Sequence, residues 1–86
     1  MSIFDLNKKR SDFSARLNTQ TDYQYLNQSA TTYAEKIRVL LNTYFDLYNY
    51  GQVEKYEILQ RIRSSNEVHF HSACFELFIN ARQSKT

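Results

Sequence analysis

Proline is absent from this 86-residue sequence, and glycine occurs once, at Gly51. These two residues most strongly interrupt helices and build tight turns, so their scarcity favours helices over a sheet with many turns. A single glycine also cannot make the glycine-rich loop that cradles nucleotide phosphates. The sequence therefore predicts an all-α fold, a small bundle of three main helices plus a short N-terminal helix or arm.

Cysteine and long apolar runs are scarce as well. The single Cys74 cannot form a disulfide within the chain, and the first residues lack the apolar run of a secretory signal. No apolar stretch approaches the roughly 18–20 residues that cross a bilayer. We therefore expect a cytoplasmic protein without a membrane partner.

Net charge is low, whereas aromatic residues are abundant. The formal charge of +2 is too small to create a strong field for a polyanion, so composition does not favour nucleic acid as a partner. Seven Tyr and six Phe make up 15% of the chain. Because a chain this short hides only roughly 60–65% of its unfolded surface, an aromatic-rich core is expected to compensate.

The chain divides by its hydrophobic pattern into an arm and a bundle. Residues 1–20 mix isolated apolar groups with the run Lys8, Lys9 and Arg10, and no helical period persists there. We predict an N-terminal basic arm that can form a short helical turn at residues 11–17 and can pack through Phe4 and Phe13. Residues 21–86 are predicted to form the helical bundle, with a further short turn at residues 22–27.

The longest predicted helix begins at Thr31 or Thr32, because Thr32 and Glu35 have the spacing of a capping box. Gly51 is expected to end it in the left-handed conformation. Its core stripe is predicted to consist of Tyr33, Ile37, Leu40, Leu41, Tyr44, Phe45 and Tyr48. On the opposite side, Val39, Leu47 and Tyr50 need a cover, which the arm, a second copy or a foreign partner could supply.

Two further helices are predicted at residues 52–63 and from about Asn66 to residue 82 or 83. The first directs its apolar side chains inward and Arg61 outward, the inward residues being Val53, Tyr56, Leu59 and Ile62. The second has one apolar stripe of Phe70, Ala73, Cys74, Leu77, Phe78 and Ala81, and a second of Val68, Phe75 and Ile79. So wide an apolar surface is typical of a helix that is central to a fold or shared with another chain. The predicted partner-binding residues are Val39, Leu47, Tyr50, Val68, Phe75 and Ile79.

No set of residues predicts catalysis, a cofactor or a metal ion. His69 and His71 diverge by about 200° on a helix and cannot ligate one ion together. His71 is expected between Phe75 and Phe78, in or near the core, and Cys74 is expected as a buried structural thiol. The polar strip of His69, Ser72, Glu76 and Asn80 lacks an enclosed site for a reactive group. We therefore predict that the chain is not an enzyme.

Two stretches of the sequence resemble the N-terminal helical region of certain uncharacterised bacterial proteins. They read Tyr25-Leu-Asn-Gln-Ser-Ala, followed by Ala34-Glu-Lys-Ile-Arg-Val-Leu-Leu-Asn-Thr-Tyr-Phe, and Arg61-Ile-Arg-Ser-Ser-Asn, followed by Ser72-Ala-Cys-Phe-Glu-Leu-Phe. In those larger proteins a similar helix leads into a restriction-endonuclease-like domain. The acidic and lysine catalytic motif of that family would follow the last helix and is not in this chain, so the resemblance implies a helical accessory region without nuclease residues.

The function that the sequence favours is a non-enzymatic protein–protein interaction module, including self-association as a homodimer. One alternative is an inhibitor of host defence carried by a phage or mobile element. Another is a nucleic-acid-binding accessory module using Lys8, Lys9, Arg10 and Arg16. A third is the truncated N-terminal region of a nuclease.

Overall fold

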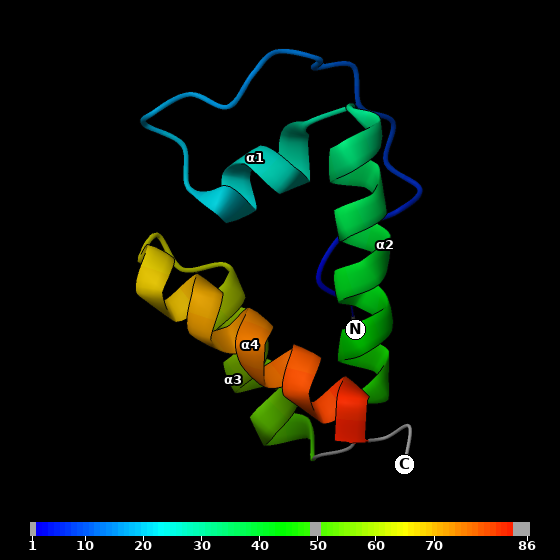
Figure 1. The fold of residues 1–86 in the computed structure, drawn as a ribbon, viewed down its shortest axis with the longest axis vertical. Helices are drawn as coiled ribbons and strands as arrows, with labels where there is room; N and C mark the ends of the chain where they lie inside the picture. Colours follow the sequence, from blue (N-terminus) through cyan, green and yellow to red (C-terminus); the bar gives the residue numbers. More distant parts are fainter. Residues whose placement is uncertain (1, 49–50, 84–86) are drawn as a thin grey trace.

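The structure, a computed structural model, describes residues 2–48 and 51–83, the side chain of Gln83 excepted. Its elements are helices α1 (Asp22–Gln28), α2 (Thr32–Leu47), α3 (Gln52–Ile62) and α4 (Glu67–Gln83) (Figure 1). These described residues contain no strand, only an isolated parallel bridge between Asp12 and Ser29. The predicted all-α fold, with three main helices and a short N-terminal one, is confirmed.

Polar side chains fix the starts of three helices. Thr21 caps α1 in a capping box, because Gln24 N–H donates to its Oγ1 at 3.1 Å and its own N–H donates to Gln24 Oε1 at 3.0 Å. Thr31 caps α2 by accepting from Ala34 N–H at 3.3 Å. Asn66 Oδ1 accepts from Val68 N–H at the start of α4. The predicted helix starts at Thr31 and Asn66 are therefore confirmed. The capping box predicted for Thr32 and Glu35 is wrong, because the N-cap residue is Thr31.

Gly51 does not end α2, so that prediction is wrong. The helix ends at Leu47, and Tyr48 leaves it in an extended conformation with its N–H donating to Phe45 O. Gly51 instead has φ −67° and ψ 173° and lies at the N-cap of α3. The residue that the sequence assigned to a helix end is therefore the start of the next helix.

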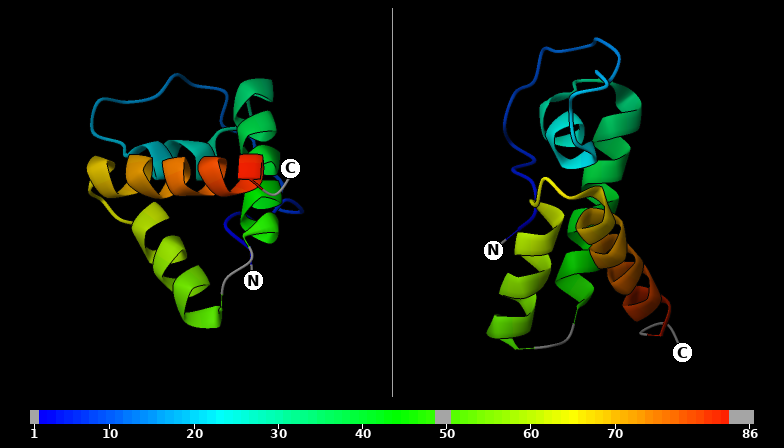
Figure 2. Two further views of the ribbon diagram at one scale, coloured as in Figure 1. Left: turned by 60° about the horizontal axis from the view of Figure 1, so that its bottom comes forward. Right: turned by 90° about the vertical axis from the view of Figure 1, so that its left-hand side faces the viewer.

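The core lies where α4 crosses the other helices. Helix α4 packs against α2, α3 and α1, and α1 also packs against α2 (Figures 1 and 2). The buried side chains of this core come from all four helices and the arm: Ile3, Phe4, Leu26, Ala34, Leu41, Phe45, Ile58, Leu59, Ile62, Phe70, Ala73 and Leu77. The radius of gyration is 13.0 Å, against about 12 Å for a compact chain of this length. The arrangement is therefore more open than a closed bundle.

The arm is fixed to the bundle at its beginning. Phe4 is 2% exposed, and its ring stacks on Tyr23 with centroids 5.4 Å apart. Its N–H donates to Asn42 Oδ1 at 3.0 Å, and its carbonyl accepts from Asn42 Nδ2 at 2.8 Å. Phe4 thus packs as expected, but Phe13 is 72% exposed and residues 11–17 form no helical turn.

Helix α2 is rotated relative to the prediction. Its buried residues are Ala34, Arg38, Leu41, Asn42 and Phe45. Two members of the predicted core stripe, Tyr33 and Leu40, are exposed instead. The physical reason is that Arg38 and Asn42 bond to backbone groups of other segments, and polar groups satisfied in this way can be buried at low cost. The prediction for Tyr33 and Leu40 is therefore wrong.

Helix α3 is covered only toward its C-terminal end. Ile58, Leu59 and Ile62 are buried, whereas Val53 and Tyr56 are exposed, contrary to the prediction. Figure 2 shows the reason, because the beginning of α3 diverges from α4. In the first turns of this helix, Lys55 lies over the Phe45 ring of α2, whereas Val53 and Tyr56 remain exposed.

Candidate interaction surface

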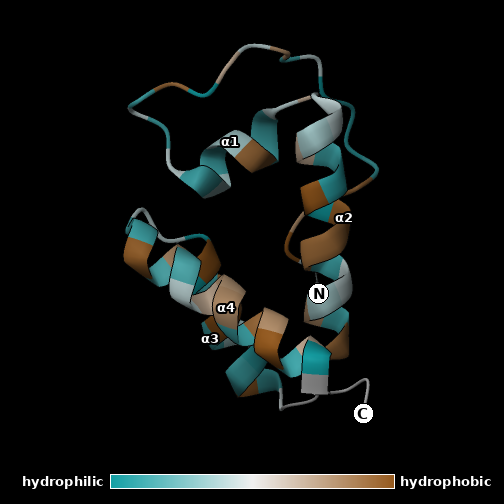
Figure 3. Cartoon of the chain, in the orientation of Figure 1, coloured by the Kyte–Doolittle hydropathy of each residue, from teal (hydrophilic) through white to brown (hydrophobic). Residues whose placement is uncertain are grey.

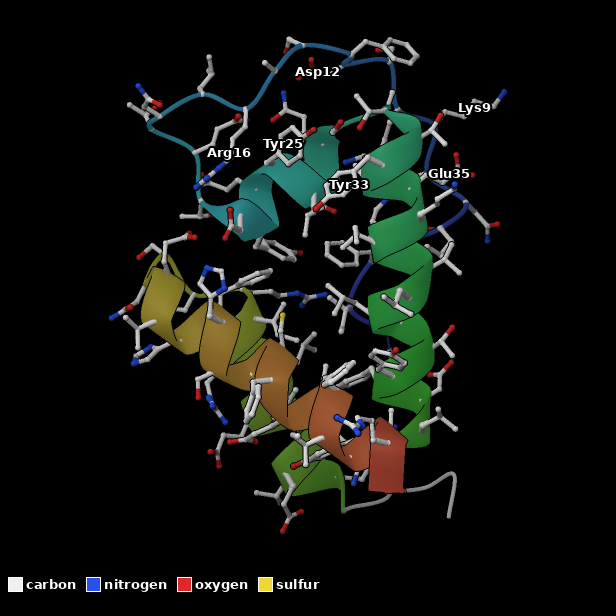
Figure 4. All side chains as sticks on the ribbon, viewed as in Figure 1. Lys9, Asp12, Arg16, Tyr25, Tyr33 and Glu35 are labelled. Carbon is white, nitrogen blue, oxygen red and sulfur yellow. The ribbon has the colours of Figure 1, made fainter. Side chains whose placement is uncertain are left out.

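An apolar surface runs along the side of α2 that is turned toward α4. Helix α2 contributes Tyr33, Ile37, Leu40 and Tyr44, and α4 contributes Cys74 and Phe78; we call these six residues the α2–α4 face. The Tyr44 and Phe78 rings meet edge to face, with centroids 6.1 Å apart. Tyr33 is 67% exposed, and Figure 4 shows it projecting from α2 on the side of α1 and α4. Figure 3 shows hydrophobic residues on both helices that border this surface.

A hollow of about 420 Å³ opens at the α1 end of the α2–α4 face. Its wall includes Leu26 from α1 and Phe70 from α4, besides Tyr33, Ile37, Leu40 and Cys74. A volume in this range accepts a large apolar group, and mostly apolar walls are typical of binding hollows. The geometry therefore suits insertion of an aromatic or aliphatic side chain.

Cys74 forms part of this wall as a neutral thiol. Burial raises its pKa to about 11, and the negative charge of Asp22 acts in the same direction. Since the thiolate is the reactive form of cysteine, the group behaves here as a small apolar side chain.

Charged residues join α1 to α4 at the rim of the hollow. His71 Nε2 lies 3.0 Å from Asp22 Oδ2 and 3.7 Å from Glu67 Oε2. Arg16 Nη1 lies 3.2 Å from Asp22 Oδ1, and Asp22 N–H donates to Glu67 Oε1. The expectation that His71 lies near the core between Phe75 and Phe78 is wrong, because its ring is exposed and turned toward the acidic first residue of α1.

Asp22, Glu67 and His71 each offer one ligand atom, and these atoms lie within 4.8 Å of one another. Such a set could hold a divalent cation, but Arg16 already approaches both carboxylates, at 3.2 and 3.8 Å. Both acidic residues also occupy the first turns of helices, where negative charge is stabilised. No local pattern predicts this cluster, because Asp22 and Glu67 are 45 residues apart.

The predicted partner-binding residues separate into two groups in the structure. Val68 and Phe75 are exposed on α4 and Ile79 is half-buried. Val39 and Leu47 are exposed on α2, where Val39 lines a shallow hollow together with Leu40. Tyr50 lies outside the described residues. The sequence reasoning assigned Tyr33, Ile37, Leu40 and Tyr44 to the core. In the structure Ile37 and Tyr44 pack against the core, whereas Tyr33 and Leu40 are exposed.

Of the four predicted nucleic-acid-binding cations, Lys8, Lys9 and Arg10 line one hollow together, whereas Arg16 lies apart from them. Lys8 and Lys9 are exposed, but Arg10 donates from Nε to Asn27 O at 2.6 Å. Arg16 pairs with Asp22 at the far end of the arm. Two of the four side chains therefore hold the arm against the bundle.

The polar strip on α4 serves as a contact between helices. Arg61 of α3 donates from Nη2 to Ser72 Oγ at 2.6 Å and from Nη1 to Glu76 Oε1 at 3.0 Å. Arg61 therefore bonds to α4, whereas the sequence predicted that it points outward. Glu76 therefore acts as a partner of Arg61 across the two helices.

Among residues 2–48 and 51–83, no helix is long and apolar enough to cross a bilayer. Comparisons of the chain with protein families, with curated proteins and with solved structures find no match.

Proposed function

We propose that this chain is a non-enzymatic protein-interaction module that pairs with a second copy of itself through the α2–α4 face. The observation that supports this is the incomplete cover of α2. Tyr33, Leu40 and Phe78 are exposed while their neighbours Leu41 and Leu77 are buried. Burial of such apolar surface contributes about 25 cal/mol per Å², so a second copy gains free energy by covering it.

The surface beside the α2–α4 face favours pairing of identical chains. Val68 and Phe75 are exposed on α4, the same helix that contributes Phe70 and Cys74 to the groove that Tyr33 and Leu40 border. In a two-fold interface both copies offer the same surface. The ridge formed by Val68 and Phe75 of each copy can therefore enter the groove of the other copy, so that the same contact forms twice. Phe75 in the ridge and Tyr33 at the groove are aromatic, and aromatic residues are enriched in interface cores.

The charges on α4 also favour a second copy in the antiparallel sense. The helix carries Glu67 in its first turn and Arg82 in its last turn. Its 17 residues span about 25 Å, so antiparallel pairing of two α4 helices brings Glu67 of each copy toward Arg82 of the other. This arrangement also opposes the two helix dipoles.

The experiment is a measurement of solution mass by light scattering over a micromolar concentration range. We expect twice the chain mass for the wild type, and the mass of one chain for Leu40→Glu and Phe75→Glu, because each places a charge within the interface. Val53→Glu is the matched control, since Val53 is an exposed apolar residue on α3 that lies outside the face. Circular dichroism checks that all variants remain helical.

A wild type that stays monomeric at high micromolar concentration contradicts self-association. If Val53→Glu dissociates the dimer as strongly as Leu40→Glu does, the chain self-associates but the interface does not lie on the α2–α4 face. The inhibitor of host defence and the nuclease-associated helical region remain predictions from the sequence, and both require a foreign partner on this face.

A further inference from the structure

A second hollow lies on the other side of α2 from the α2–α4 face. It has a volume of about 230 Å³ and is formed by the arm and α2. Figure 4 shows Glu35 and Lys9 on this side of the helix and Tyr33 on the other. Its lining consists of three cations, one carboxylate and three apolar residues: Lys8, Arg10, Arg38, Glu35, Leu6, Ala30 and Val39.

Arg38 is the deepest of these cations, at 5% exposed. Its Nη1 donates to Leu26 O and to Ser29 O, both at 2.6 Å. In the described residues it has no ion pair with a carboxylate. Buried charges are ordinarily paired with an opposite charge. Here burial and the nearby charge of Arg10 lower the pKa of Arg38, and the negative charge of Glu35 opposes this only in part.

Arg10 is held in the same way, by neutral carbonyls. Its Nε donates to Asn27 O at 2.6 Å, and its Nη1 donates to Asp5 O and Lys8 O at 3.1 Å. These bonds explain why Arg10 and Arg38 lie at the end of α1. Positive charge stabilises the C-terminal end of a helix, and α1 has no basic residue in its own last turn. The bonds do not explain why a third cation, Lys8, lines the same hollow.

The hollow therefore carries an excess of positive charge. Lys8, Arg10 and Arg38 contribute three positive charges and Glu35 one negative charge, which leaves +2. The carbonyl oxygens that accept from Arg10 and Arg38 carry only partial negative charges, so they offset only part of this positive charge. A ligand with two negative charges and several oxygen acceptors matches this charge and the guanidinium donors.

We propose that the hollow formed by Lys8, Arg10 and Arg38 binds a phosphate group, either as inorganic phosphate or as a phosphomonoester. Leu6 and Val39 border the hollow and offer apolar contact to the substituent of a monoester. This site lies away from the α2–α4 face and does not depend on self-association.

The test is a titration of the full chain with inorganic phosphate at constant ionic strength, followed by the NMR signals of the Arg10 and Arg38 Nε–H groups. Saturable shifts with phosphate, and none with chloride, are expected. Glu35→Gln removes the only carboxylate of the lining and should tighten binding, whereas Lys8→Ala should weaken it, each roughly three- to tenfold from the change in Coulomb energy. Both residues are exposed, so neither change removes a core contact.

Lys9→Ala is the matched control, because it makes the same charge change one residue away and Lys9 does not line this hollow. It should leave the affinity within twofold. Phenyl phosphate in place of inorganic phosphate distinguishes the two sources, since tighter binding of the ester identifies a phosphomonoester and equal binding identifies free phosphate.

Three outcomes overturn the proposal. The first is the absence of saturable phosphate shifts. The second is an unchanged affinity in Glu35→Gln. The third is equal weakening by Lys8→Ala and Lys9→Ala together with tighter, steeply salt-dependent binding of a single-stranded oligonucleotide, which indicates diffuse attraction of a polyanion.

Discussion

Cys74 illustrates how the core of this small molecule sets the chemistry of one residue. The thiol lines the apolar hollow between α1, α2 and α4, and burial raises its pKa to about 11 from the ordinary 9.0. The raised pKa belongs to the folded state alone. Stability is therefore unaffected by this group below pH 9.0 and falls as pH rises toward 11, because the unfolded thiol ionises first.

We expect the thiol to react slowly with iodoacetamide. At pH 8 a pKa near 11 leaves about a hundredfold less thiolate than a pKa of 9.0, and the thiolate is the nucleophile. Mass spectrometry should show alkylation slowed by at least this factor relative to the chain unfolded in guanidinium, and accelerating up to pH 11. Equal rates for folded and unfolded protein at pH 8 contradict the buried thiol.

Arg38 and Asn42 show which residue-scale features the sequence could not predict. Both are polar and lie one turn apart on α2, so a hydropathy pattern places them in solvent. They are buried because their partners are backbone groups at Leu26, Ser29 and Phe4, distant in the sequence by 9 to 38 residues. No local pattern encodes such partners. Because Arg38 and Asn42 occupy the buried side of α2, Tyr33 and Leu40 lie outside the core.

At the scale of helices, α3 begins without a side-chain cap. Gly51 at its N-cap makes no side-chain hydrogen bond, and its extended conformation suits other residues. A Cβ at this position would lie 2.8 Å from Glu54 Oε2, the mobile end of a side chain that can move aside. Glu54 is also the third helical residue, which is the acidic position of a capping box.

Gly51→Ser should therefore stabilise the protein by about 0.5–1 kcal/mol, through a new cap and a less flexible unfolded chain. Urea unfolding followed by circular dichroism measures the change. Gly51→Ala is the control that adds a Cβ without a cap, and it should be less stable than the serine variant. Destabilisation by both substitutions would indicate the left-handed conformation that the sequence alone suggested.

The helices themselves were largely predictable, since caps and hydrophobic period are local. Thr31 and Asn66 correctly marked two starts, and the main stripe of α4, from Phe70 to Ala81, is largely buried. The end of α2 and the inward side of α3 were not predictable. Both depend on which neighbour covers the helix, and Val53 and Tyr56 are exposed only because α3 diverges from α4.

At the scale of the whole molecule, the arm and the bundle share one core. Ile3 and Phe4 are buried with residues of all four helices, and Arg63 donates to Ile3 O at 3.3 Å. The sequence predicted that the arm can pack through Phe4, but not that Ile3 is buried or that Arg63 bonds to it, because an arm without helical period carries no signal of where it packs. The interface proposed for α2 and α4 would add about 800 Å² per copy, about one-seventh of the 5905 Å² that the chain exposes.

Phe4→Ala should lower the free energy of unfolding by about 3–5 kcal/mol, because it leaves a cavity against Tyr23. Urea unfolding should show one transition that shifts as a whole. The matched control is Phe13→Ala in the same arm, where an exposed ring should change stability by less than about 0.5 kcal/mol. If the two variants behave alike, the arm does not belong to the core.

The burial of Ile3 and Phe4 has a consequence for biosynthesis. These residues are translated before their partners Asn42 and Arg63, which follow by 38 and 60 residues. During synthesis, Ile3 and Phe4 therefore leave the ribosome before their partners do, and their packing is complete only when α2 and the end of α3 have emerged from the exit tunnel.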